Sequence, residues 1–282
     1  RMTGLVFAVV ILAAALHAAW NALVKGGADK SAAMVAVVVG QGLFGAALLP
    51  FVPFPAAESW PYLAGSVVLH MLYQVFLMQS YRFGDLTQVY PIARGVAPLL
   101  VALTSAFILG VTFSSLEIAA VAMISIGIAS VSLVRRGDGI LQGKAAVLAL
   151  ITGCFIAAYS VTDGLGARLA GTALGYFGVL SALDAVIFAG IARVWKPGLL
   201  GRSLALKRSL ILGGGASFTA YALVVWAFTQ APIALVTALR ETSIIFALMI
   251  GVFLLGERLS LAKVLSTALT LAGAVLLRVS RA

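Results

Sequence analysis

Charged residues are scarce in this sequence. Asp, Glu, Lys and Arg make up 10% of its 282 residues, whereas 62% are hydrophobic and the mean hydropathy is +1.13. So few charges cannot cover the surface of a water-soluble domain of this length. The composition therefore predicts that most of the chain is surrounded by lipid.

Cysteine and soluble-enzyme motifs are also nearly absent. Cys154 is the one cysteine and lies in an apolar run, so no disulfide framework can form. The sequence has no HExxH, CxxC, P-loop or GxGxxG pattern, and its two histidines are far apart. We therefore expect no enzymatic activity, metal site or cofactor. The net charge of +10 is spread beside apolar runs, near lipid headgroups, so nucleic acid is not an expected partner.

Long apolar runs are what the chain has in abundance. A transmembrane helix needs about 20 mostly apolar residues. Ten runs of that kind follow one another, separated by short segments that contain proline, glycine or charge. They predict an all-α, multi-pass integral membrane protein with ten transmembrane helices: 4–24, 32–52, 61–81, 86–109, 115–134, 144–164, 171–192, 209–229, 232–254 and 261–279.

The two halves of the chain resemble each other. At constant offsets Trp20 matches Tyr159, and Arg94 matches Arg240. Arginine within a membrane is rare, so a matched pair carries weight. We predict two five-helix repeats, 1–134 and 144–282, joined by a linker at 135–143. Because five is odd, the second repeat would be inverted, as in many alternating-access transporters.

Polar side chains inside the apolar runs are the candidate site. At bilayer depth such side chains normally face the bundle interior or an aqueous cavity. Two runs carry a His, an aromatic residue and an amide at spacing i, i+3, i+4, which places each trio on one helical face. We interpret the trios as the lining of a solute cavity, with interhelical hydrogen bonding as the alternative. They are His17, Trp20, Asn21, His70, Tyr73 and Gln74.

Two intramembrane arginines extend this candidate site. Tyr90 and Arg94 are four residues apart on a run interrupted by two prolines. Arg94 would hold a substrate carboxylate or be paired with a helix-end carbonyl or an acid such as Asp163. Its repeat counterpart, Arg240, precedes Glu241. Neighbours on a straight helix point about 100° apart, so we expect these two not to pair with each other.

The remaining candidates are acids and tyrosines. Tyr159 and Tyr81 would add aromatic surface to the cavity. Asp163 lies near the end of its run, where a solvated interface position is expected. Asp184 is deeper and is the best single acid for proton coupling, with a structural partner as the alternative. The coupling candidates are Asp184, Glu241 and Asp163.

A family resemblance covers essentially the whole chain. The Ala-aromatic pairs at 19–20 and 158–159, the Gly-Glu-Arg-Leu-Ser sequence at 256–260 and the two inverted halves resemble the EamA-type drug/metabolite transporter superfamily. Within it the chain looks most like the YddG-type amino-acid exporters. The resemblance implies a secondary transporter that exports a small organic solute, an amino acid first of all, across a bacterial inner (plasma) membrane.

The sequence leaves two membrane orientations and more than one function open. Most loop Lys and Arg lie on the face opposite the termini, which places the termini outside the cytoplasm, whereas the family description places them inside. The alternative functions are a nucleotide-sugar or organic-anion exchanger and an intramembrane enzyme. Only Arg94 and Arg240 would hold an anion, and only His17 and His70 would supply a catalytic pair. The expected partners are the substrate and membrane lipid; the oligomeric state stays open, a monomer included.

Overall fold

The computed structural model describes residues 2–25, 27–83, 86–133, 143–253 and 261–280, and every regular element in these ranges is a helix. This confirms the all-α prediction. The motif at 256–260 and residues 135–142 of the expected linker lie outside these ranges. The helices are α1 (Gly4–Lys25), α2 (Lys30–Leu48), α3 (Trp60–Phe83), α4 (Leu86–Phe107), α5 (Ser115–Leu133), α6 (Gly143–Leu169), α7 (Ala173–Trp195), α8 (Leu199–Ala205), α9 (Gly214–Gln230), α10 (Ile233–Arg240), α11 (Ser243–Phe253) and α12 (Leu261–Val279), with short helical turns η1 (Leu49–Phe51), η2 (Ala57–Ser59) and η3 (Ser209–Gly213).

Six helical segments of the described chain are long and apolar enough to cross a membrane. Their outward faces carry exposed aliphatic and aromatic side chains, such as Leu5, Val186 and Phe253, as a lipid-facing surface requires. The protein is therefore a helical membrane protein. The six segments are Gly4–Val24, Lys30–Phe51, Gly143–Leu169, Ala173–Val194, Ser209–Gln230 and Ile233–Phe253; shorter apolar helices are Ile92–Phe107, Ser115–Ser130 and Val264–Val279.

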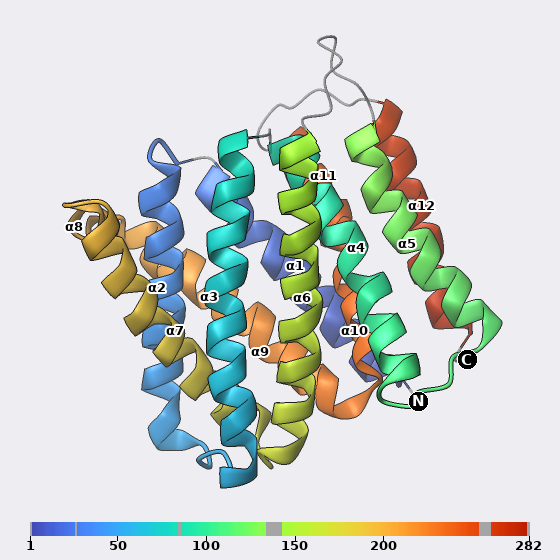
Figure 1. Ribbon diagram of the computed structural model, residues 1–282, viewed down its shortest axis with the longest axis horizontal. Coiled ribbons are helices and arrows are strands. Elements are labelled where there is room, and N and C mark those ends of the chain that lie inside the picture. Colours follow the sequence, from blue (N-terminus) through green and yellow to red (C-terminus); the bar gives the residue numbers. More distant parts are fainter. Residues whose placement is uncertain (1, 26, 84–85, 134–142, 254–260, 281–282) are drawn as a thin grey trace.

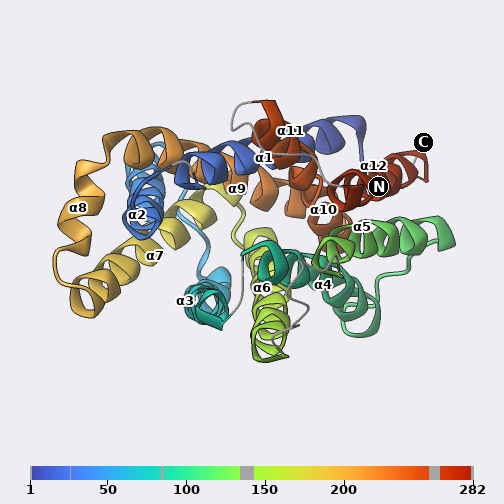
Figure 2. The ribbon, with the colours of Figure 1, turned by 90° about the horizontal axis from the view of Figure 1, so that it is seen from above.

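The helices stand side by side in two rows (Figure 1). Viewed from above, α3, α6 and α4 lie in one row and α1, α9 and α10 in the other (Figure 2). Helices α2 and α7 pack together toward one end of the bundle, and α5 packs against α12 at the other. The middle of the bundle is therefore enclosed by α1, α3, α4, α6, α9 and α10.

Glycines allow the closest helix contacts. A Cβ added at Gly42 of α2 would overlap the side chain of Ala185 in α7, and one at Gly45 would overlap Ser181. Between α5 and α12, a Cβ at Gly127 would lie 2.8 Å from Thr270 Oγ1. Without side chains at these positions the backbones approach closely, which strengthens van der Waals packing between membrane helices.

The loop between α1 and α2 is fixed by Asp29. Its Oδ1 accepts the N–H of Ala32 at 3.0 Å, capping α2, and its Oδ2 accepts Nε of Arg202 in α8 at 3.3 Å. The hydrogen bond from Ala32, assisted by Arg202, lowers the pKa of the Asp29 carboxyl below its ordinary value. Asp29 thereby ties α8 to the start of α2.

The ninth apolar run contains a break. It was expected to form one helix over 232–254, but α10 ends at Arg240 and α11 begins at Ser243. Between them the N–H groups of Glu241 and Thr242 bond to carbonyls three residues back, at 3.1 Å each, and tighten the chain into a turn. The expectation of a straight helix is wrong at this point, and the break changes which side chains can meet.

Candidate functional site

A histidine joins two aspartates inside the bundle. His70 of α3 places Nε2 3.1 Å from Oδ2 of Asp163 in α6, and Nδ1 3.1 Å from Oδ2 of Asp184 in α7. The side chain of His70 is 15% exposed, that of Asp163 is 0% and that of Asp184 is 5%. We call these three residues the histidine–aspartate cluster.

Hydroxyl groups surround Asp163 in this cluster. Tyr221 of α9 donates to Oδ2 at 2.6 Å, Tyr176 of α7 donates to Oδ1 at 3.4 Å, and Ser66 of α3 also donates to Oδ1. In contrast, Oδ1 of Asp184 is buried and accepts no hydrogen bond from the described residues. The two carboxylates therefore differ: both oxygens of Asp163 accept hydrogen bonds from protein side chains, whereas Oδ1 of Asp184 accepts none from the described residues.

The sequence led us to expect Asp163 at a solvated interface, and this expectation is wrong. Helix α6 continues to Leu169, beyond the predicted end at residue 164, because the residues that follow remain compatible with a helix. Asp163 is consequently more than one turn inside the helix and is fully buried. Its neighbours are hydroxyl and imidazole donors rather than lipid headgroups.

A second group of buried charges lies at the break between α10 and α11. Nε of Arg94 in α4 donates to Oε2 of Glu241 at 2.8 Å, and Nε of Arg240 lies 3.8 Å from Oε1 of the same carboxylate. The expectation that Arg240 and Glu241 would not pair is wrong, because Glu241 belongs to the turn rather than to a straight helix. These three residues, the arginine–glutamate cluster, carry a net charge of one positive.

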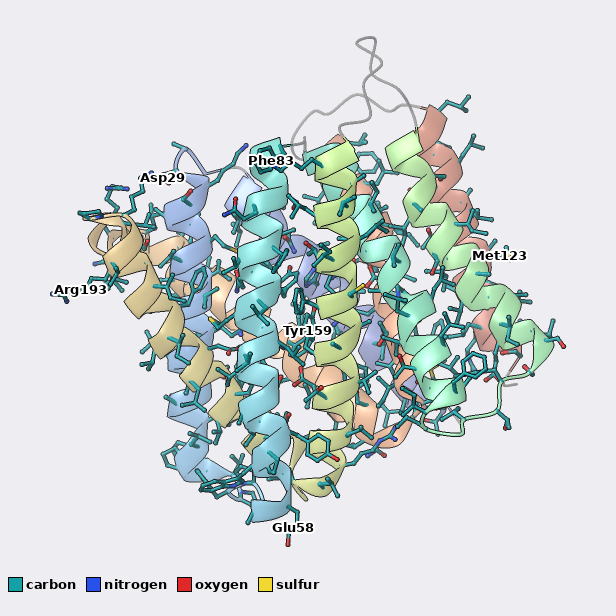
Figure 3. The ribbon with its side chains drawn as sticks, in the orientation of Figure 1. Asp29, Glu58, Phe83, Met123, Tyr159 and Arg193 are labelled. Atoms are coloured by element: carbon teal, nitrogen blue, oxygen red, sulfur yellow. The ribbon has the colours of Figure 1, made fainter. Side chains whose placement is uncertain are left out.

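Aromatic side chains connect the two clusters. The hydroxyl of Tyr221 bonds to Asp163, while its ring lies 5.8 Å from the Arg240 guanidinium carbon. The ring of Tyr159 is 4.3 Å from that of His70 and 5.6 Å from that of Tyr73. Figure 3 shows Tyr159 about midway along α6, far from Asp29 and Glu58 at opposite ends of the molecule. The clusters thus lie in the middle of an apolar bundle.

The first predicted trio lies on α1. The rings of His17 and Trp20 are 5.1 Å apart in an edge-to-face arrangement, and the Asn21 amide donates to the His17 carbonyl at 2.8 Å. Helix α1 packs mainly on α9 and α11, whereas α3, with His70, Tyr73 and Gln74, packs mainly on α6. That the two trios share one solute cavity remains a prediction.

The structure thus brings together six of the predicted residues in the two clusters and places Tyr73 and Tyr159 beside them. The side chains of Tyr81 and Tyr90 lie outside the described part of the chain. Sequence reasoning had not selected Ser66, Tyr176 or Tyr221 as site residues. One signal could have found Ser66: it precedes His70 by four residues and so shares its helical face.

A pocket of about 400 Å³ lies near the α6–α7 turn and the end of α9; it is lined by Ala167, Arg168, Gly171, Thr172, Ala173, Trp226, Thr229 and Gln230. Arg168 donates there to the carbonyl groups of Phe228 and Ala231, both at 2.9 Å. Across the described ranges, no group of three His, Cys, Asp or Glu side chains could hold a metal ion.

Comparison with known proteins places the fold but no function. Neither the known protein families nor the curated proteins contain a match to this chain. Among solved structures, 28 chains match. One of them, described only as the crystal structure of a protein, superposes with a TM-score of 0.74 over 98% of this chain and 97% of its own, at 19% identity. The whole chain therefore adopts a fold that has been seen experimentally.

Proposed function

We propose that the protein is a secondary transporter of the EamA type, which moves a small organic solute across the inner (plasma) membrane by alternating access. The observation that carries this proposal is the pair of buried charge clusters in the middle of an apolar bundle. Burying ionised groups is costly, and in membrane helices they commonly mark the path of a substrate or an ion. A purely structural bundle would gain more from apolar packing at these positions.

An amino acid fits the charges of the two clusters best. The arginine–glutamate cluster has one positive charge in excess and would attract a carboxylate. The histidine–aspartate cluster has two carboxylates against one imidazole and would attract an ammonium group. Between them lie the rings of Tyr159 and Tyr221, 6.2 Å apart, which offer the flat faces that cations and apolar side chains both favour. Export is the direction that the family resemblance implies.

We further propose ten membrane crossings arranged as two inverted repeats, 1–134 and 144–282. The segments η3–α9 and α10–α11 would each make one crossing. In this arrangement α1, α2 and α3 of the first half correspond to α6, α7 and α9 of the second. Helix contacts support it, because they recur when each helix is exchanged for its counterpart. The contact of α3 with α6 corresponds to that of α9 with α1, and the contact of α3 with α7 to that of α9 with α2; α2–α7 and α5–α12 are self-paired.

Solute exchange in proteoliposomes tests the transport proposal. We expect vesicles that contain the purified protein and an unlabelled amino-acid mixture to take up at least one labelled amino acid faster than empty vesicles. Asn21→Ala, Tyr73→Ala and Gln74→Ala should each weaken apparent affinity; a lost contact worth about 1.4 kcal/mol gives a tenfold change. Glu58→Gln, at an exposed position in the short turn η2, is the matched control.

The rival solutes are tested in the same vesicles. The excess positive charge around Glu241 is the observation that favours an organic-anion or nucleotide-sugar exchanger. Uptake of such anions without uptake of any amino acid would replace the amino-acid proposal. Folded protein that exchanges no solute of either class would contradict the transport proposal as a whole.

A further inference from the structure

The buried charges of the two clusters balance only when one proton is bound. With His70 protonated, three cations, His70, Arg94 and Arg240, face three anions, Asp163, Asp184 and Glu241. Without that proton the same interior carries one uncompensated negative charge. Because an uncompensated charge is costly in a low-dielectric interior, the bundle favours the state with one proton.

Glu241 is a poor place for that proton. Its Oε2 accepts a hydrogen bond from Arg94 and its Oε1 lies 3.8 Å from Nε of Arg240, and a guanidinium group stays charged at any pH that a cell reaches. A proton on Glu241 would leave two buried arginines without an anion. The exchangeable proton therefore belongs elsewhere, although sequence reasoning had included Glu241 among the coupling candidates.

The histidine–aspartate cluster has the opposite imbalance. Two carboxylates share one imidazole, and no Lys or Arg of the described chain is within ion-pair distance of either. The unused Oδ1 of Asp184 is a second acceptor, buried and aimed at no other donor. The proton can therefore be held on the His70 ring or between its Nδ1 and Asp184 without breaking the contacts of Asp163.

Other groups that face this cluster do not compete for the proton. Ser66 on α3, Tyr176 on α7 and Tyr221 on α9 donate hydroxyl hydrogens to Asp163, and Tyr159 on α6 contributes its ring. One fixed charge lies beside these groups: the guanidinium carbon of Arg240 on α10 is 5.8 Å from the Tyr221 ring. Hydroxyl donors already occupy both oxygens of Asp163, which leaves His70 and Asp184 as the exchanging pair.

We propose that His70, Asp163 and Asp184 form a single proton-binding site, which binds and releases one proton in each transport cycle. This inference rests on the proposed transport function. The released proton passes to water on the side to which the site is open, and the solute's positive group takes its place beside the two carboxylates. Because His70 belongs to the first half of the chain and both aspartates to the second, the proton also changes how strongly the halves attract each other.

Nitrogen-15 NMR of labelled histidine tests the resting state directly. The chain has two histidines, so His17→Gln leaves the His70 signal alone. In lipid nanodiscs at neutral pH we expect both ring nitrogens of His70 to carry hydrogen. Infrared spectra of the same sample would report a protonated carboxyl group if the proton sits on Asp184 instead. A neutral His70 together with fully ionised Asp163 and Asp184 would overturn the proposal.

Single substitutions locate the proton. Asp184→Asn should remove one proton from the number that the protein takes up across the neutral range. His70→Gln leaves three anions against two cations and should keep that proton on a carboxyl group. Glu58→Gln, an exposed carboxyl outside the bundle, should change neither the NMR spectrum nor proton uptake in that range. If Asp184→Asn does not fold, Asp163→Asn tests the same charge balance. Unchanged proton uptake in a folded Asp184→Asn or Asp163→Asn protein contradicts the proposal.

Transport completes the test and separates the two proposals. In proteoliposomes a pH gradient should accelerate uptake by the original protein. Asp184→Asn, which also removes one carboxylate from the solute site, should lose that acceleration at whatever rate of solute exchange it keeps. Gradient-driven uptake that persists in folded Asp184→Asn overturns the proton site while leaving transport intact. A protonated His70 in a protein that moves no solute overturns transport while leaving the proton site intact.

Discussion

Each member of the arginine–glutamate cluster depends on the others. Arg94, Arg240 and Glu241 are each less than a tenth exposed, so none can exchange its protein partner for water. A buried ion pair need not stabilise a protein more than apolar residues would, but removing one member leaves a bare charge in a dry interior. Glu241 is the single anion between two cations, so its loss has the largest effect.

Glu241→Gln should therefore destabilise the protein by about 3–5 kcal/mol. Unfolding in detergent, followed by circular dichroism, measures the change. Glu58→Gln is the matched control and should stay within about 0.5 kcal/mol of the original protein, because its side chain is exposed. Combining Glu241→Gln with Arg94→Gln should restore part of the loss. If the double variant loses as much stability as the two single variants added together, the 2.8 Å contact between Arg94 and Glu241 contributes nothing.

For single residues, the sequence predicts which charged side chains belong to the site more reliably than it predicts the residues they pair with. Intramembrane charge is rare enough that Arg94, Asp184 and Glu241 stand out by composition alone. Their partners come from other helices, and pairing across helices has no periodicity in the sequence. Asp163 illustrates the limit, because its burial follows from where α6 ends and from what packs on it.

Among the elements, α2 shows how membrane helices use small residues. Its Gly42 and Gly45 face α7, and the two backbones approach so closely that a methyl group has no room. There is no hydrophobic driving force between helices in lipid, so such contact surfaces supply much of the attraction. The position of a glycine on its helix thus decides what a substitution does.

Gly42→Ala and Gly190→Ala should have opposite effects. The added methyl at position 42 would overlap Ala185, and overpacking of this kind costs about 1–3 kcal/mol. At position 190 of α7 nothing lies within 4 Å of the added methyl, so the better helix propensity of alanine should stabilise by about 0.5–1 kcal/mol. Thermal unfolding of the two variants side by side measures the difference. A neutral Gly42→Ala would show that α2 and α7 can separate without cost.

Most elements could be predicted from apolar runs, because length and composition alone define a helix that suits lipid. The break after Arg240 could not, since no proline or glycine marks it and the residues on both sides favour a helix. The turn is stabilised instead by the contacts that Glu241 makes with Arg94 and Arg240. Tertiary contacts have overridden local preference there.

For the whole molecule, the unequal distribution of basic residues predicts the orientation. Asp29 and Glu58 lie at opposite ends of the bundle (Figure 3), and Ala28 belongs to the same loop as Asp29. The positive-inside rule places the loop with Ala28 in the cytoplasm. In a Cys154→Ser background, an impermeant thiol reagent added to intact cells should therefore label Glu58→Cys and leave Ala28→Cys unlabelled. The reverse pattern would support the family orientation, and labelling of both would contradict a bundle that spans the membrane.

The pairing of α5 with α12 has a consequence for how the protein is made. Gly127 of α5 fits against Ser266 and Thr270 of α12, yet α5 ends at Leu133 and α12 begins at Leu261. At a synthesis rate of about 5–20 residues per second, the ribosome releases α5 on the order of ten seconds before its partner exists. During that interval lipid or an insertion factor must cover the glycine face. Any ribosome that stops before residue 261 leaves a nascent chain whose edge is open, and membrane quality control can recognise it there.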